Sequence, residues 1–359
     1  MQKMKQATSK ITNEKENKMN KSPAQIWRME DSELKPIVSF YPLAKTHIVI
    51  NGSTAPVLCG RICEFSRLNS LATKWNDVTP NSLRCSTEHF LVIEINLWKS
   101  NPTNGNSNSI AVEIRRLKGD ALQFHKLKCL LFKSLVSTKG NCRHEKATPA
   151  NYCTNADRRP LQLKFLGDAL HSVSIACDLI SKDTTQETIS GMQILIFFTD
   201  PRSVHPVYAA HVSNMILTGF DPFGLKTDVR KLVYRHVVSN HDDAVHHCAL
   251  QIIGNCLYTI RADSIFKDYE LDLWGSIVPA LLQDMEHVDH NPHIACNATR
   301  CFRGWISAKA RGSDSAVDFS IDVDRCRMKN IIARMISYGK ENHAKLERES
   351  MALLATIVT

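Results

Sequence analysis

The chain has 359 residues, of which 43% are hydrophobic and 23% charged, with a formal net charge of +9. This composition is typical of a folded chain and excludes a largely disordered one. The longest apolar runs, at 194–198 and 277–282, are too short to cross a bilayer.

The twelve cysteines are spread along the whole chain. They lack the short spacing of a disulfide framework, so they indicate a reducing compartment. The lysines near the N-terminus have no apolar core behind them, so we expect no secretory signal there. These features predict a cytoplasmic protein, with the nucleus or a membrane surface as alternatives.

Positive charge is concentrated in the first part of the chain. Residues 1–140 contain 21 Lys and Arg against 11 Asp and Glu, whereas residues 141–359 contain 24 against 25. We therefore expect an anionic partner to meet the N-terminal part. Residues 1–40, rich in Lys, Asn and Glu, are predicted to form a disordered basic arm.

Residues 45–137 show the alternation of a small α+β domain. A helical pattern over 59–75 precedes two strand patterns, 90–98 and 110–117. In the second strand we expect Val112 and Ile114 to point inward and Glu113 and Arg115 outward. A helix is predicted over 121–135, with Asp120 as its cap.

The segment IAVEIRRLKGDALQFHKL at 110–127 resembles the last strand and helix of the kinase-associated C-terminal domain found in microtubule-affinity-regulating kinases. Residues 83–98 look like the strand before it, so the resemblance covers about a quarter of the chain. It implies binding to anionic phospholipid head groups. The chain has no Gly-rich loop, His-Arg-Asp or Asp-Phe-Gly motif of a kinase.

A basic cluster in this region is the predicted anion-binding site. It comprises Arg115, Arg116, Lys118, Lys126, Lys128 and Lys133. We expect phospholipid to be the anion. Nucleic acid is the alternative, which the scarcity of interleaved aromatic residues disfavours.

After a predicted linker at 138–160, residues 161–359 have the patterns of an all-α superhelical solenoid. Helix pairs are expected at 165–182 and 185–199, 228–240 and 243–260, 274–286 and 292–308, and 325–339 and 344–358, with an extra helix at 203–218. The last helix is either a cap of the array or an interface.

The second helix of each pair opens on a small residue followed by apolar residues at +3 and +4. The small residues are Gly191, Ala249, Ala298 and Ser350, at spacings of 58, 49 and 52. A short side chain allows close helix crossing, so the pattern predicts a stacked array.

The array resembles armadillo or HEAT repeats, most closely at ALQIIGNCL (249–257). The resemblance implies that Asn255 contacts an extended peptide in a groove. Arg300 and Arg303 beside Trp305 are further candidates for the partner-binding groove, because arginine with an aromatic residue is typical of binding anchors.

We expect no metal site and no catalytic site. His287, His290, His293 and Cys296 have ligand chemistry, but Pro292 interrupts their helix. Cys142, His144 and Cys153 lack a second paired motif, and none of the common nucleophile or metalloprotease motifs occurs.

The sequence therefore predicts an adaptor that is not an enzyme, with no cofactor. Its sheet region would bind anionic membrane and its repeats a protein or peptide. A nucleic-acid-binding protein, or a Cys/His- or metal-dependent enzyme, is the alternative.

Overall fold

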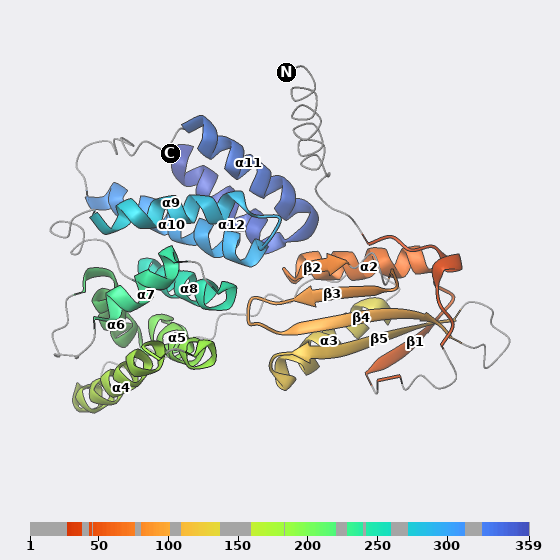
Figure 1. Cartoon of the computed structure of the whole chain (residues 1–359), viewed down its shortest axis with the longest axis horizontal. Helices are drawn as coiled ribbons and strands as arrows, with labels where there is room; N and C mark the ends of the chain where they lie inside the picture. Colours follow the sequence, from red (N-terminus) through yellow and green to blue (C-terminus); the bar gives the residue numbers. More distant parts are fainter. Residues whose placement is uncertain are drawn as a thin grey trace, which may run out of the picture.

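A computed structural model describes residues 27–37, 43–44, 46–75, 80–100, 109–136, 159–182, 184–219, 228–239, 242–259, 272–312 and 325–358. These residues form a sheet domain (residues 27–136) beside a helical domain (residues 159–358), as Figure 1 shows. Each has its own cluster of buried apolar side chains. The predicted linker, apart from its last residues, lies outside the described residues.

The sheet domain contains five strands and two α-helices. In chain order these are β1 (His47–Asn51), α2 (Ala55–Leu68), β2 (Ala72–Trp75), β3 (Ser82–Ser86), β4 (Val92–Lys99), β5 (Ser109–Lys118) and α3 (Ala121–Val136). The strands are ordered β1-β5-β4-β3-β2, and every neighbouring pair is antiparallel. The α+β expectation is confirmed.

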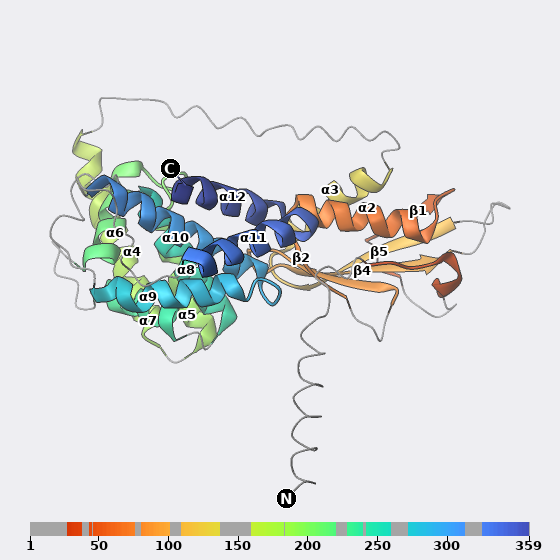
Figure 2. The same ribbon diagram turned by 90° about the horizontal axis from the view of Figure 1, so that it is seen from above.

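Helices α2 and α3 lie on the same side of the sheet (Figure 2). Alternate residues of β4 and β5, such as Ile95 and Ile114, are buried against them, as the period of two predicts. The prediction that Glu113 points to solvent is wrong, because its side chain is 1% exposed on the other side of the sheet. Its carboxylate accepts hydrogen bonds from the Ala44 amide at 2.7 Å and the Trp98 indole at 3.2 Å.

Two predicted boundaries in this domain are also wrong. The helical pattern over 59–75 contains the end of α2, a turn and then β2, because Ser70 adopts a left-handed conformation (φ 53°) that a helix does not tolerate. The predicted arm, 1–40, extends too far, because Trp27, Met29 and Leu34 are buried in the sheet domain's core. Residues 1–26 lie outside the described residues.

The helical domain follows the predicted helices closely. Its helices are α4 (Arg159–Ile180), α5 (Thr185–Thr199), α6 (Pro206–Thr218), α7 (Val229–Val238), α8 (Asp243–Thr259), α9 (Asp272–Glu286), α10 (Pro292–Gly312), α11 (Arg325–Asn342) and α12 (Ala344–Val358). Several begin at clear sequence signals. The Thr184 hydroxyl accepts from the amide of Glu187, and prolines occupy the first positions of α6 and α10.

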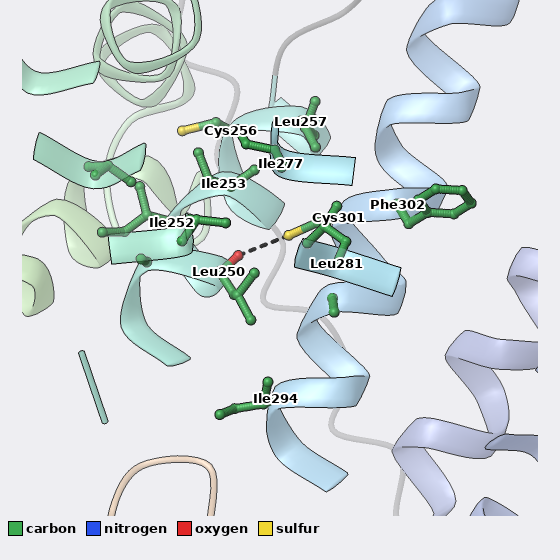
Figure 3. Packing of buried hydrophobic residues seen from close by; sticks show 14 of the residues in the cluster. Leu250, Ile252, Ile253, Cys256, Leu257, Ile277, Leu281, Ile294, Cys301 and Phe302 are labelled. Atoms are coloured by element: carbon green, nitrogen blue, oxygen red, sulfur yellow. Dashed lines mark hydrogen bonds between the residues drawn. The ribbon is translucent and has the colours of Figure 1, made fainter. Parts of the chain in front are cut away.

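Within this domain α5 packs on α8, α8 on α10 and α10 on α12. Figure 3 shows the core between α8, α9 and α10, to which Ile253, Ile277 and Cys301 contribute side chains. The Cys301 thiol donates to the carbonyl oxygen of Leu250 at 3.1 Å in the same region. Free cysteines therefore act here as small core residues.

The small residues do not open the second helices as predicted: Gly191, like its equivalents, lies well inside its helix, where it meets the preceding one. A Cβ atom at this position would lie 2.6 Å from the carbonyl oxygen of Ala176 and 2.7 Å from Cγ1 of Ile180. Helices α4 and α5 therefore cross at a distance that only glycine permits. The equivalent residues Ala249, Ala298 and Ser350 are fully buried.

We predict that Gly191→Ala lowers the free energy of unfolding by about 1–3 kcal/mol, because a well-packed crossing must open to admit the methyl group. Urea denaturation of the full chain measures the change. The matched control is Gly275→Ala in α9, where a Cβ would meet nothing within 4 Å. That variant should be more stable by about 0.5–1 kcal/mol, since alanine restricts the unfolded chain more than glycine. Equal effects at the two positions would contradict the close-crossing interpretation.

Candidate functional site

The two domains meet at what we call the domain junction. Here the turn between β3 and β4 (residues 86–91) contacts the N-terminal ends of α8, α10 and α12. Beside this turn, the backbone amide of Lys345 donates to the Ser70 hydroxyl at 2.9 Å. Three helices thus present their N-terminal ends to the end of the sheet where β3 turns into β4.

The sequence provides a side-chain cap for each of these helix ends. The Asp242 carboxylate accepts from the amide of Ala244 at 2.8 Å, at the start of α8. The Asn291 side chain accepts from the amide of Ile294 in α10 at 3.3 Å. At the start of α12 the cap is His343, whose Nδ1 accepts from the amide of Leu346 at 3.1 Å.

The hydrogen bonds of His343 and His293 assign one tautomer to both rings. Because Nδ1 of His343 accepts the Leu346 amide, the ring's proton is on Nε2, which donates to Nδ1 of His293 at 3.2 Å. His293 then carries its proton on Nε2 and donates to the carbonyl oxygen of Ser86 at 3.0 Å. A continuous chain of hydrogen bonds therefore runs from α12 through α10 to β3, and it requires both rings to be neutral.

His247 on α8 is the third histidine of the junction. Its ring meets Phe90 edge-on, with centroids 5.4 Å apart, and lies 6.3 Å from the ring of His293. Phe90 belongs to the sheet domain but packs against the core of the helical domain. Beside these residues is a cleft of about 170 Å³, whose lining also includes Glu88 and Lys118.

The environment holds these histidines in the neutral form. Burial, followed by the proximity of His293, lowers the pKa of His247 and of His343 to about 3. Burial also lowers the pKa of His293, although its bond to Ser86 favours the charged form. The positive ends of three helix dipoles act in the same direction.

Glu88 is the acidic counterpart of these groups. Burial would raise its pKa, but the charge and hydrogen bond of Lys345 outweigh burial and lower the pKa to about 2. The two side chains form an ion pair between the β3–β4 turn and α12. This carboxylate thus stays charged beside neutral histidines.

His246, next to His247 in the chain, shows the opposite behaviour. Burial opposes its charged form, but Asp284 and the carbonyl of His236 accept from its two ring nitrogens at 2.8 and 2.9 Å and raise its pKa. His246 and Asp284 are 1% and 6% exposed, so they form a buried ion pair between α8 and α9. This pair lies inside the helical domain and ties its helices together.

The structure divides the predicted basic cluster among several surfaces. Arg115 lies on the side of the sheet away from the helices, 3.5 Å from Glu94, and Arg116 donates to the carbonyl oxygen of Gly119 at 2.6 Å. Lys118 lines the junction cleft, and Lys128 is half-buried. Lys126 and Lys133 remain together, on the outer face of α3.

Sequence reasoning missed two exposed apolar residues beside those two lysines. Leu122 and Leu130 are 62% and 52% exposed, and with Lys126 and Lys133 they form a stripe that we call the α3 outer face. The signal was present in the sequence as leucines at i and i+8 on the side opposite the buried Leu127. An outer stripe of alternating leucine and lysine is typical of helices that lie on a membrane surface.

Two residues of the predicted partner-binding groove are buried, which corrects that prediction. Asn255 is 3% exposed; its amide donates to the carbonyl oxygen of Ile196 at 3.4 Å, and its oxygen accepts from Arg300 at 3.1 Å. It therefore joins α5, α8 and α10. Trp305 is 3% exposed and packs beside Phe302.

The two predicted groove arginines stay half-exposed but are engaged within the domain. Arg300 also lies over the ring of Tyr258, 6.0 Å from its centroid. Arg303 forms an ion pair with Glu349 at 2.9 Å. A separate apolar groove of about 470 Å³ lies between α4 and α5, where Ile175 and Phe197 are 42% and 50% exposed.

The structure does not bring together the four residues that have zinc-ligand chemistry in the sequence. His287 and His290 are exposed, His293 uses both ring nitrogens in the junction, and burial raises the pKa of the Cys296 thiol to about 12. Within the described ranges no group of three His, Cys, Asp or Glu side chains could hold a metal ion. Cys142, His144 and Cys153 lie outside those ranges.

No protein-family model matches the chain, and none of the curated proteins is significantly similar to it. Among the described residues, no helix is long and apolar enough to span a bilayer. The function must therefore be argued from the surfaces themselves.

We predict that Glu88 and Lys345 stabilise each other by about 1.5–3 kcal/mol, the range for hydrogen bonds to charged groups. A double-mutant cycle with Glu88→Gln and Lys345→Met, measured by urea denaturation at pH 7, gives this coupling free energy. The control cycle uses Lys182 and Glu187, whose ion pair is more exposed and whose coupling should be weaker. Coupling at the junction no larger than in the control would contradict the assigned role.

The raised pKa of His246 gives a pH dependence of known sign. The histidine's contribution to stability is present below its unfolded pKa, near 6.5, and is lost as pH rises through the higher folded value. Asp284→Asn should therefore cost about 3–5 kcal/mol at pH 6, the range for breaking a buried pair, and less at pH 9.

Denaturation of this variant at both pH values checks the prediction, with the exposed Asp178→Asn as the control. A cost for Asp284→Asn that does not change with pH would show that His246 is neutral in the folded state.

Proposed function

We propose that the protein is a non-enzymatic adaptor whose sheet domain binds an anionic phospholipid surface and whose helical domain binds a protein or peptide. The α3 outer face carries this proposal. It combines exposed Leu122 and Leu130 with Lys126 and Lys133 on one helix that is anchored to the sheet by its opposite side. Leucines can enter the head-group region while lysines contact anionic lipid.

This surface is smaller than the predicted six-residue cluster. Arg115 and Arg116 have partners within the sheet domain, and Lys118 lines the junction cleft. These three residues would contribute to lipid binding through the electrostatic potential of the domain rather than through direct contact. The mixed apolar and basic character favours membrane over nucleic acid, since few exposed aromatic rings accompany these charges.

We predict that Lys126→Glu with Lys133→Glu lowers the affinity for phosphatidylserine-containing vesicles by at least about 25-fold, since each lysine contributes about 1 kcal/mol near an anionic surface. Co-sedimentation with vesicles measures this. Leu122→Ser with Leu130→Ser should weaken binding as well. The matched control is Lys74→Glu, an exposed lysine at the far edge of the sheet.

Unchanged binding in the charge-reversed variant would exclude this face as the lipid site. If instead the wild type ignores vesicles but binds single-stranded RNA with a steep dependence on salt, the nucleic-acid alternative replaces the lipid proposal.

For the helical domain we propose an armadillo- or HEAT-like stack. Successive packing of α5, α8, α10 and α12, with a small buried residue inside each, supports this interpretation. The α4–α5 groove is the best candidate for the partner site, because its exposed Ile175 and Phe197 could receive apolar side chains of a peptide.

Peptides selected from a display library on the full chain should lose at least about tenfold in affinity on Phe197→Ser, a change of about 1.4 kcal/mol at a buried anchor. Fluorescence anisotropy measures the affinity. Val238→Ser, at a residue of similar exposure on α7, is the control. Selected peptides that bind both variants equally would place the partner site elsewhere.

A further inference from the structure

The domain junction depends on histidines in a specific protonation state. Nδ1 of His343 and Nδ1 of His293 are both hydrogen-bond acceptors, from the Leu346 amide and from Nε2 of His343 respectively. A proton added to either nitrogen turns an acceptor into a donor that faces another donor. Protonation therefore removes the bond and leaves a buried charge without a partner.

We propose that the domain junction is an acid-sensitive latch: it is closed while His247, His293 and His343 are neutral, and it opens when they take up protons. Opening separates the β3–β4 turn from the N-terminal ends of α8, α10 and α12. The two domains remain joined through the chain between α3 and α4. This inference is independent of the lipid-binding proposal.

Among the charges around the histidines, Glu88 favours the charged form of all three rings, but burial outweighs it. Facing the three rings are Glu88 and His89 from the β3–β4 turn, Lys345 from α12, Lys118 and Asp243 at the cleft, and the His246–Asp284 pair further along α8 and α9. Glu88 is already engaged by Lys345, and Asp284 by His246. The three helix ends add further positive potential.

Backbone strain lies at the same contact. Among the described residues, the two non-glycine residues with positive φ are Ser70 (φ 53°) and Phe90 (φ 60°). Ser70 accepts the Lys345 amide, and Phe90 packs against His247. Backbone hydrogen bonds within the sheet domain hold both residues in place, from the amide of Leu71 to the carbonyl oxygen of Ser66 and from the amide of Thr87 to that of Leu91.

The sign of the pH effect follows from linkage. In the open state the histidines would regain a pKa near 6.5, whereas burial lowers it in the closed state, to about 3 for His247 and His343. The open form therefore binds more protons below pH 6.5, and each histidine shifts the equilibrium toward it by up to about tenfold per pH unit. Three together give up to about a thousandfold per unit.

Amide hydrogen exchange of the full chain, followed by mass spectrometry between pH 6 and 5 and corrected for intrinsic rates, measures the opening constant. The reporters are the amide of Lys345, which donates to Ser70 across the junction, and the amide of Leu346, which donates to the ring of His343. We expect the logarithm of the opening constant to rise by about two to three for each unit by which the pH falls. Amides of β4 and β5 should stay protected over the same range.

Variants count the protons directly. His343→Asn keeps a helix cap but cannot titrate, and should lower the slope by about one. His247→Gln, as a second variant, should do the same, while His211→Asn, at an exposed position of α6, should leave the slope unchanged. Because the slope reports protons rather than stability, a folded variant of lower stability still gives a valid reading.

A wild-type slope below two would overturn the latch. So would an unchanged slope in both junction variants, or loss of protection in β4 and β5 in parallel with the reporters, since that would be global unfolding.

Discussion

The N-terminal ends of α8, α10 and α12 all face one turn of the sheet, and most features of the junction follow from that arrangement. Each helix end carries backbone amides without intrahelical partners and a partial positive charge. Side chains of Asp242, Asn291 and His343 satisfy some of these amides. The same potential favours the Glu88 carboxylate and opposes imidazolium. Helix orientation therefore acts together with burial and with the charge of Lys345 in setting which groups of the junction are charged.

Adjacent histidines on α8 show how strongly local geometry decides protonation. His246 and His247 are consecutive and both buried, yet the pKa of the first is raised and that of the second lowered. The difference is direction: one ring points to the Asp284 carboxylate, the other toward Phe90 and His293. Burial alone would have lowered both. Asp284, from the same domain, favours the charged form of His246. His247 instead lies beside Phe90 of the other domain and stays neutral.

Local features of the fold could be predicted from the sequence, and long-range ones could not. Helix boundaries in the second half were close because Pro292 and caps such as Thr184 act within one turn. The end of α2 was missed because nothing in the apolar period reveals the positive φ of Ser70.

Likewise, Glu113 looked solvent-facing, since its partners come from β4 and from residue 44. The junction joins Ser86 to His293, 207 positions apart, and no local pattern predicts such a contact.

Phe90 of the sheet domain packs among residues of the helical domain. This contact constrains how the two domains could be separated or recombined. A helical domain separated from the sheet would expose an apolar site and three helix ends; a sheet domain alone would display an aromatic ring on a strained turn. Exchange of either half with another protein would leave these contacts unmet. Recombination would preserve the closed junction only if the β3–β4 turn and its three receiving helices were inherited together.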